Sequence, residues 1–184
     1  MYGQFGEQFR RQRPRARAFT FTEVLVVVCI LGIASAVVLP QVGNRYDVNA
    51  AAAARTVMAD LLYAQNRAIS TQSMQYVNFD VAGQQYGLYS SMSPSQFLKH
   101  PVTLGDYLMT FGQNGPNNVS SDVTLTSASF NGHTTLAFDE TGVPYSYTSG
   151  TATPLTAAGA IVLTCEAYSL TISVTKDTGE ITVN

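Results

Sequence analysis

The feature that most constrains this chain is a run of 21 residues, 24–44, without a charged side chain. As an α-helix this run would extend for about 31 Å at ~1.5 Å per residue, and the hydrocarbon core of a bilayer is about 30 Å thick. A positively charged flank favours the cytoplasmic side of a membrane. Five arginines precede the run: Arg10, Arg11, Arg13, Arg15 and Arg17. The sequence therefore predicts a single-pass transmembrane helix over residues 19–44, with the N-terminus cytoplasmic and the remaining chain on the other side.

Charge is divided unevenly along the chain. Residues 19–184 hold five basic and eleven acidic residues, which gives that part a formal charge of −6. Proteins that bind phosphate backbones need concentrated Lys and Arg. The composition therefore makes nucleic acid an unexpected partner for the body of this protein.

The residues that most often carry catalysis or hold metals are sparse. The two histidines, His100 and His133, stand before a proline and after a predicted turn, without a metal-ligand cluster or a nucleophile motif. Asp139 and Glu140 precede Thr-Gly, a pattern more typical of a turn than of a cation site. We expect no enzymatic activity, no cofactor and no metal.

A second helical segment follows the apolar run. Pro40 lies inside the helical pattern and is predicted to kink the helix or loosen one turn. Apolar residues then recur at three- and four-residue steps, namely Val57, Met58, Leu61, Leu62, Ala68 and Ile69. The charged residues Arg55, Asp60 and Arg67 are predicted to fall between them. We expect residues 45–71 to continue the membrane helix as one long helix whose apolar stripe covers a sheet.

From about residue 72 the composition favours β-structure. Two hairpins are predicted, one over 75–91 around Ala-Gly-Gln and one over 123–138 around Asn131-Gly132. Further strands are predicted at 161–165, 170–174 and 181–183, and long loops at 92–122 and 140–159, with a short strand near 107–111. The predicted fold class is α+β, a long N-terminal helix packed on an antiparallel β-sheet domain over residues 72–184.

The start of the apolar run reads Ala18-Phe19-Thr20-Phe21-Thr22-Glu23. This segment resembles the processing junction of type IV prepilins: a basic leader, a small residue before the cut, Phe after it, and Glu as the fifth mature residue. The resemblance implies that residues 1–18 are a leader, and that prepilin peptidase cuts between Ala18 and Phe19 and methylates the new amine of Phe19. A proline is common in the family where Pro40 stands. Ala18 departs from the usual Gly, and Phe21-Thr22 from the usual Leu-Ile.

Glu23 is an acid within an otherwise apolar segment, a placement that costs a few kcal/mol unless the group serves a purpose or reaches water. The resemblance implies that its carboxylate compensates the amine of Phe19, on its own chain or on a neighbouring subunit, and so sets registry during assembly. The alternative interpretation is a carboxylate at a helix start, where the helix dipole favours an acid.

A rival interpretation of the apolar run also exists. Ala34-Ser35-Ala36 resembles a conventional secretory cleavage site. A cut after Ala36 would release a soluble protein that begins at Val37. Hydrophobicity continues through residues 37–39, however, and such a cut leaves the junction around Glu23 unexplained.

The order of segments in the body resembles the GspH/FimT branch of minor pilins, through residues 59–69, 136–142 and 170–181. This resemblance implies a minor pseudopilin, a structural subunit of a type II secretion pseudopilus that is rooted in the bacterial inner membrane and assists protein export. Its partners would be other pseudopilins or pilins, bound through the N-terminal helix, and its body would be periplasmic, at or near a filament tip. The alternative is a FimT-like minor pilin for DNA uptake or pilus assembly, but residues 176–184 hold one Lys against two acids.

Overall fold

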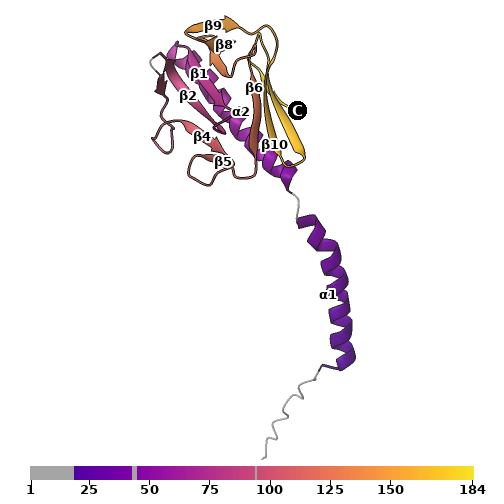
Figure 1. The fold of residues 1–184 in the computed structure, drawn as a ribbon. Helices are drawn as coiled ribbons and strands as arrows, with labels where there is room; N and C mark the ends of the chain where they lie inside the picture. The colour runs from indigo at the N-terminus through magenta and orange to yellow at the C-terminus, as the bar shows by residue number, and fades with distance from the viewer. Residues whose placement is uncertain (1–18, 43–44, 94) are drawn as a thin grey trace, which may run out of the picture. The chain divides into compact units, whose positions relative to one another are not determined.

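The computed structural model describes residues 19–42, 45–93 and 95–184, with the backbone alone for 36–42. The chain divides into two units, Met1–Asn44 and Arg45–Asn184. The first contains α1 (Phe21–Val42) and the second contains α2 (Tyr46–Thr71) with all the described strands (Figure 1). The predicted leader over residues 1–18 lies outside the described residues.

The single long helix of the prediction is divided in the structure. α1 ends at Val42, and Arg45, with φ −109° and ψ 28°, lies outside both helices. The sequence between them is Gly43-Asn44, residue types that favour helix ends, and these two lie outside the described residues. α1 includes Pro40, and a kink there stays a prediction. Within the described residues, no helix is both long and apolar enough to cross a bilayer.

α2 confirms the predicted amphipathic helix, and Val57, Leu61 and Ala68 of the predicted stripe are buried, but the buried face is shifted from the predicted one. Leu62 and Ile69, predicted in the apolar stripe, are 40% and 42% exposed, whereas Asp60, predicted between the apolar positions, is only 9% exposed. The buried residues are Ala50, Ala53, Ala54, Val57, Asp60, Leu61, Ala64 and Ala68. Because alanine side chains are short, this face brings α2 close to strands of both sheets.

The larger sheet has the strand order β5-β4-β2-β1-β7-β8-β9, with β3 also paired to β2 (Figure 1). Its strands are β1 Gln75–Asp80, β2 Gln85–Met92, β3 Ser95–Phe97, β4 Leu108–Phe111, β5 Asn118–Ser120, β7 Thr135–Phe138, β8 Pro144–Thr148 and β9 Thr151–Pro154. The predicted hairpin of residues 75–91 is confirmed by the antiparallel pairing of β1 with β2.

The prediction of a wholly antiparallel sheet is wrong at one edge, where β4 and β5 are parallel. Gly112 directly after β4 has φ +67°, and residues 112–117 bring the chain back beside β4, where the amide of Thr110 donates to the carbonyl of Asn117 at 2.9 Å. The amide of Gly112 then donates to the carbonyl of Ser120 at 2.8 Å. The predicted loop over residues 92–122 thus contains three strands instead of one.

The predicted loop over residues 140–159 is also wrong, because β8 and β9 form an antiparallel hairpin there. Ser149 and Gly150 connect these strands with φ values of 47° and 89°. A two-residue turn with positive φ at both positions matches the right-handed twist of paired strands. Ser149-Gly150, between segments in which Tyr and Thr alternate with other residues, was the sequence signal that could have predicted this hairpin.

The smaller sheet has the order β12-β11-β10-β6 and is antiparallel throughout. Its strands are β6 Thr124–Ser129, β10 Gly159–Cys165, β11 Tyr168–Val174 and β12 Ile181–Val183. The three strands predicted between residues 161 and 183 are therefore confirmed. Ile161, Leu163 and Cys165 of β10 alternate with half-buried neighbours and belong to the core.

The turn at Asn131-Gly132 is confirmed, but the hairpin predicted around it is wrong. Phe130 and His133 exchange two backbone hydrogen bonds of 2.8 and 3.0 Å, and both turn residues have positive φ. Beyond this single bridge the chain enters different sheets, since β6 pairs with β10 and β7 pairs with β1 and β8. The side chain of Asn131 donates to the carbonyl of Pro154 at 2.9 Å, which holds the turn between the sheets.

One glutamine side chain joins α2 to a turn of each sheet. The amide nitrogen Nε2 of Gln65 donates to the carbonyl of Gly142 at 2.8 Å and to that of Gly179 at 3.3 Å. Gly142 lies between β7 and β8, and Gly179 lies between β11 and β12. Gln65 therefore connects the helix and both sheets at one point.

Candidate assembly site

The start of α1 is fixed by a local cap. The hydroxyl oxygen Oγ1 of Thr20 accepts a hydrogen bond from the backbone amide of Glu23 at 3.3 Å. The carbonyl of Thr20 accepts from the amides of Glu23 and Val24 at 3.1 and 3.2 Å. A Thr three residues before a Glu is the spacing of a capping box. Glu23 lies in the first helical turn, where the partial positive charge of the helix favours a carboxylate.

The side chains around Glu23 are open to solvent. Phe19 and Phe21 are 77% and 82% exposed. A shallow groove of about 350 Å³ is lined by Thr20, Thr22, Glu23, Val26 and Val27. The groove thus combines one carboxylate with hydroxyl and aliphatic groups.

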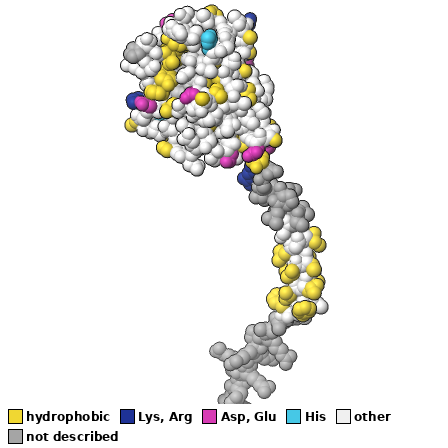
Figure 2. All heavy atoms as spheres, in the orientation of Figure 1, with side chains coloured by type: hydrophobic (Ala, Val, Ile, Leu, Met, Phe, Trp, Pro, Cys, Tyr) yellow, Lys and Arg dark blue, Asp and Glu magenta, His cyan; other side chains and the backbone are white. Residues whose placement is uncertain are grey.

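The apolar side chains of α1 are exposed along its described length (Figure 2). The exposed residues are Val24, Leu25, Val26, Val27, Val28, Ile30, Leu31 and Ile33. Five of these are consecutive, and consecutive helical residues lie about 100° apart, so apolar groups face every side. A helix with apolar side chains on every side is normally buried, either inside a protein or in a membrane.

The four predicted site residues belong to this N-terminal segment. Ala18 lies outside the described residues, and Phe19 stands directly before the cap at Thr20. Glu23 lies in the first turn of α1 and Pro40 near its end. The roles in cleavage, methylation, assembly and kinking stay predictions.

A buried polar cluster inside the body escaped the sequence analysis. Asp60 on α2 accepts hydrogen bonds from the hydroxyls of Tyr86 at 2.5 Å and Tyr107 at 2.9 Å. Burial raises the pKa of Asp60, an effect that these two hydrogen bonds and nearby His100 only partly oppose. Burial and the adjacent carboxylate in turn raise the pKa values of Tyr86 and Tyr107. Asp60 lies three residues after Val57, a spacing that could have placed it on the buried face.

Asp139 is a turn residue, as its sequence context predicts. Its Oδ1 accepts from the hydroxyl of Thr141 at 2.7 Å and from the amides of Thr141 and Val143, each at 2.9 Å. Partial burial alone would raise the pKa of Asp139, but these hydrogen bonds outweigh it and the pKa is lowered. Within the described residues, no group of three or more His, Cys, Asp or Glu side chains could hold a metal ion.

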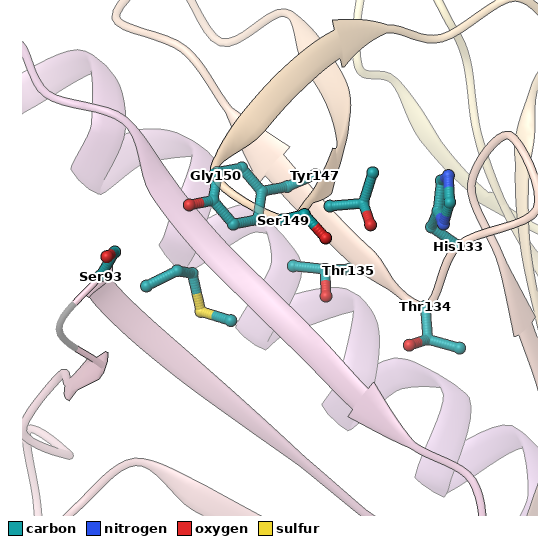
Figure 3. Close-up of a pocket in the computed structure, with 9 residues that line it drawn as sticks. Ser93, His133, Thr134, Thr135, Tyr147, Ser149 and Gly150 are labelled. Carbon is teal, nitrogen blue, oxygen red and sulfur yellow. The ribbon is translucent and has the colours of Figure 1, made fainter.

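His133 lines a separate pocket of about 480 Å³ on the body (Figure 3). The pocket lies where β2 ends, β7 begins and the β8–β9 hairpin turns. Thr134, Thr135, Tyr147 and Ser149 contribute hydroxyl groups to its lining. His100 lies elsewhere, with its ring centroid 4.6 Å from that of Tyr107.

A comparison with solved structures shows which known fold this chain resembles. The chain is similar to the minor pseudopilin EpsH from the type 2 secretion system of Vibrio cholerae, with a TM-score of 0.51 and 10% sequence identity over 74% of this chain and 96% of that one. The fold is pilin-like. The expected α+β class is confirmed, with a mixed sheet in place of the predicted antiparallel one.

Two crystal structures of the type IV minor pilin FimU from Pseudomonas aeruginosa are also similar, each at 16% identity. They cover 72% and 73% of this chain and 90% and 87% of their own chains, with TM-scores of 0.46 and 0.48. No protein-family profile and no curated protein matches the sequence. The similarity to EpsH therefore bears on the fold alone.

Proposed function

We propose that this chain is a minor pseudopilin, a structural subunit of a type II secretion filament rooted in the bacterial inner membrane. The observation that carries the proposal is the exposure of apolar side chains on every side of α1. Such a helix is covered by lipid before assembly and by neighbouring helices after it. The pilin-like fold that this chain shares with EpsH supports the same role.

Prepilin processing belongs to this proposal. Prepilin peptidase removes residues 1–18 and methylates Phe19, residues 19–44 anchor the subunit, and the body lies in the periplasm. Thr20 caps α1, so the helix begins just after the new terminus. Phe19 stands just before this cap and Glu23 lies in the first turn of α1, four residues later.

Intact-mass analysis of the protein from membranes of its native host tests the processing step. We expect a mature chain that begins at N-methylated Phe19. Edman sequencing of the same sample should release N-methyl-Phe in the first cycle, followed by Thr-Phe-Thr-Glu. A chain that begins at Val37 contradicts the proposal, since a cut after Ala36 removes most of α1.

Glu23 is proposed to match the amine of Phe19 on a neighbouring subunit. In a low-dielectric bundle an unmatched charge is costly, so Glu23→Ala should reduce incorporation into filaments at least ~10-fold, which corresponds to about 1.4 kcal/mol. The measurement is the fraction of the subunit in sheared filaments, relative to the processed subunit in the membrane.

Two further variants separate charge from capping. Thr20→Ala removes the cap, at a cost of about 1 kcal/mol to the helix, and should leave incorporation near the wild-type level. Glu23→Gln keeps the size of the side chain and should show the same loss as Glu23→Ala. Wild-type incorporation of Glu23→Ala would show that the carboxylate serves only the start of the helix.

A further inference from the structure

The larger sheet has an outer face that α2 does not cover. Along β1 the side chains of Val77 and Phe79 are buried, while Tyr76 and Asn78 between them are half-buried. Tyr76 is paired with Tyr89 of β2 across the strands. Tyr147 on β8 lies on the same face, with its ring centroid 4.8 Å from that of Tyr76. The outer face therefore carries a row of aromatic rings.

These rings are held in fixed orientations. Tyr147 meets Tyr76 edge-on at an interplanar angle of 66°, and Tyr89 stacks on Phe97 with centroids 4.3 Å apart. The rings come from strands β3, β2, β1 and β8, and the row passes over β7, which lies between β1 and β8. A side chain at Gly87 would come within 2.9 Å of Phe97, so the glycine keeps room for that ring. Rings held by neighbours lose little freedom when a ligand stacks on them.

The pocket of about 480 Å³ lies at one end of this row and is lined by neutral polar groups (Figure 3). Tyr147 borders it, and Thr134, Thr135, Ser149, Ser93 and His133 supply donors and acceptors. Thr135 is set by a hydrogen bond of 2.8 Å from its hydroxyl to Oδ1 of Asn78. The volume of the pocket falls within the range of small-ligand pockets, roughly 300–1,000 Å³.

The lining excludes several ligand classes. Among the described residues that line the pocket there is no Lys, Arg, Asp or Glu, so no charge is provided for a phosphate or a metal ion. The hydroxyl groups are too numerous for a purely apolar ligand, because each would lose hydrogen bonds to water. The matching ligand is uncharged, rich in hydroxyl groups, and has a flat face of C–H bonds for an aromatic ring.

We propose that this face binds a neutral oligosaccharide, with one sugar ring stacked on Tyr147 and its hydroxyls bonded to the Thr and Ser side chains of the pocket. An aromatic face carries partial negative charge and attracts the polarised C–H bonds of a sugar ring. The pocket holds the first sugar unit, and the row from Tyr147 through Tyr76 to Tyr89 accommodates the following units. All the residues that line this pocket belong to the Arg45–Asn184 unit.

The test uses the full chain in lipid nanodiscs, with maltohexaose, cellohexaose and N-acetylchitohexaose as probes in saturation-transfer NMR and calorimetry. We expect at least one probe to bind with a Kd of about 1 mM or lower. Tyr147→Ala should weaken that binding at least ~10-fold, as expected when an aromatic anchor is removed. Tyr147→Phe keeps the ring and should retain binding within about threefold.

Tyr168→Ala is the matched control, because Tyr168 is a 42% exposed tyrosine on β11 of the smaller sheet. It should leave binding unchanged, and circular dichroism of each variant verifies the fold. The proposal is overturned if none of the three probes binds at about 10 mM. It is also overturned if Tyr147→Ala leaves the binding unchanged, or if Tyr168→Ala weakens the binding as much as Tyr147→Ala does. Displacement of the sugar by an oligothymidylate would likewise overturn it.

Discussion

Replacing Asp60 by alanine should lower the free energy of unfolding of the body by about 2–4 kcal/mol, since each buried hydroxyl left unpaired costs roughly 1–3 kcal/mol. The two hydroxyls are those of Tyr86 and Tyr107, which are 1% and 4% exposed. Both donate to the Asp60 carboxylate in the folded protein. Urea unfolding of wild type and variant, followed by circular dichroism at equal protein concentration, measures the loss.

Asp106→Ala is the matched control for this substitution. Asp106 also accepts a short hydrogen bond, at 2.6 Å from Lys99, but both side chains are more than half exposed. Exposed ion pairs contribute about 0–1 kcal/mol, so this variant should unfold close to wild type. Adding Tyr86→Phe to Asp60→Ala should recover part of the loss, because one unpaired hydroxyl disappears. Equal effects of Asp60→Ala and Asp106→Ala would contradict the structural role of the cluster.

The Asp60 cluster also implies a pH dependence of defined sign. Because the pKa of Asp60 is raised in the folded protein, its folded form binds a proton more readily than its unfolded form. The contribution of this group is therefore fully present below the unfolded pKa and is lost as the pH rises through the folded pKa. The stability of wild type relative to Asp60→Asn should increase as the pH falls through this window.

Gly179→Ala should destabilise the body by about 2–4 kcal/mol through backbone strain and a steric clash together. Gly179 has φ +67°, a left-handed conformation that an L-residue adopts at a cost of roughly 1–2 kcal/mol. Its new methyl group would also come within 2.6 Å of the carbonyl oxygen of Gly142 and 2.5 Å of Nε2 of Gln65. The substitution therefore forces apart the point where α2 meets a turn of each sheet.

Gly150→Ala separates the two contributions. Gly150 has φ +89°, but a Cβ there has no heavy atom within 4 Å, so only the backbone strain remains. We expect Gly179→Ala to lower the midpoint of urea unfolding clearly further than Gly150→Ala does. Identical midpoints would show that the loops around Gln65 move aside without cost.

Local sequence patterns predicted the presence of strands and turns better than they predicted which strands pair with each other. Alternation around the 81–84 turn was sufficient for the β1–β2 hairpin, because the interacting residues are close in sequence. At Asn131-Gly132 the same reasoning found the turn and missed the pairing, since β1 and β10 compete successfully for the strands on either side. Strand pairing between distant segments depends on the whole fold and leaves little trace in a short window.

The candidate assembly site and the Asp60 cluster differ in the same respect. The junction around Phe19 and Glu23 is a linear pattern and can be recognised from the sequence, whereas the Asp60 cluster joins residues 26 and 47 positions apart. Asp60 was predicted to fall between the apolar positions of the helix, and the helical pattern alone does not show what a carboxylate there would bind. Its partners, Tyr86 and Tyr107, come from strands whose position relative to α2 only the folded structure reveals.

The switch of sheets at Asn131-Gly132 has a consequence for synthesis of the chain. β6 ends at Ser129, and its partner β10 begins only at Gly159. During translation, β6 is therefore synthesised well before the strand with which it pairs. A nascent chain therefore exposes the unpaired edge of β6 while residues 130–158 are being made, and that edge can pair with other chains until β10 covers it.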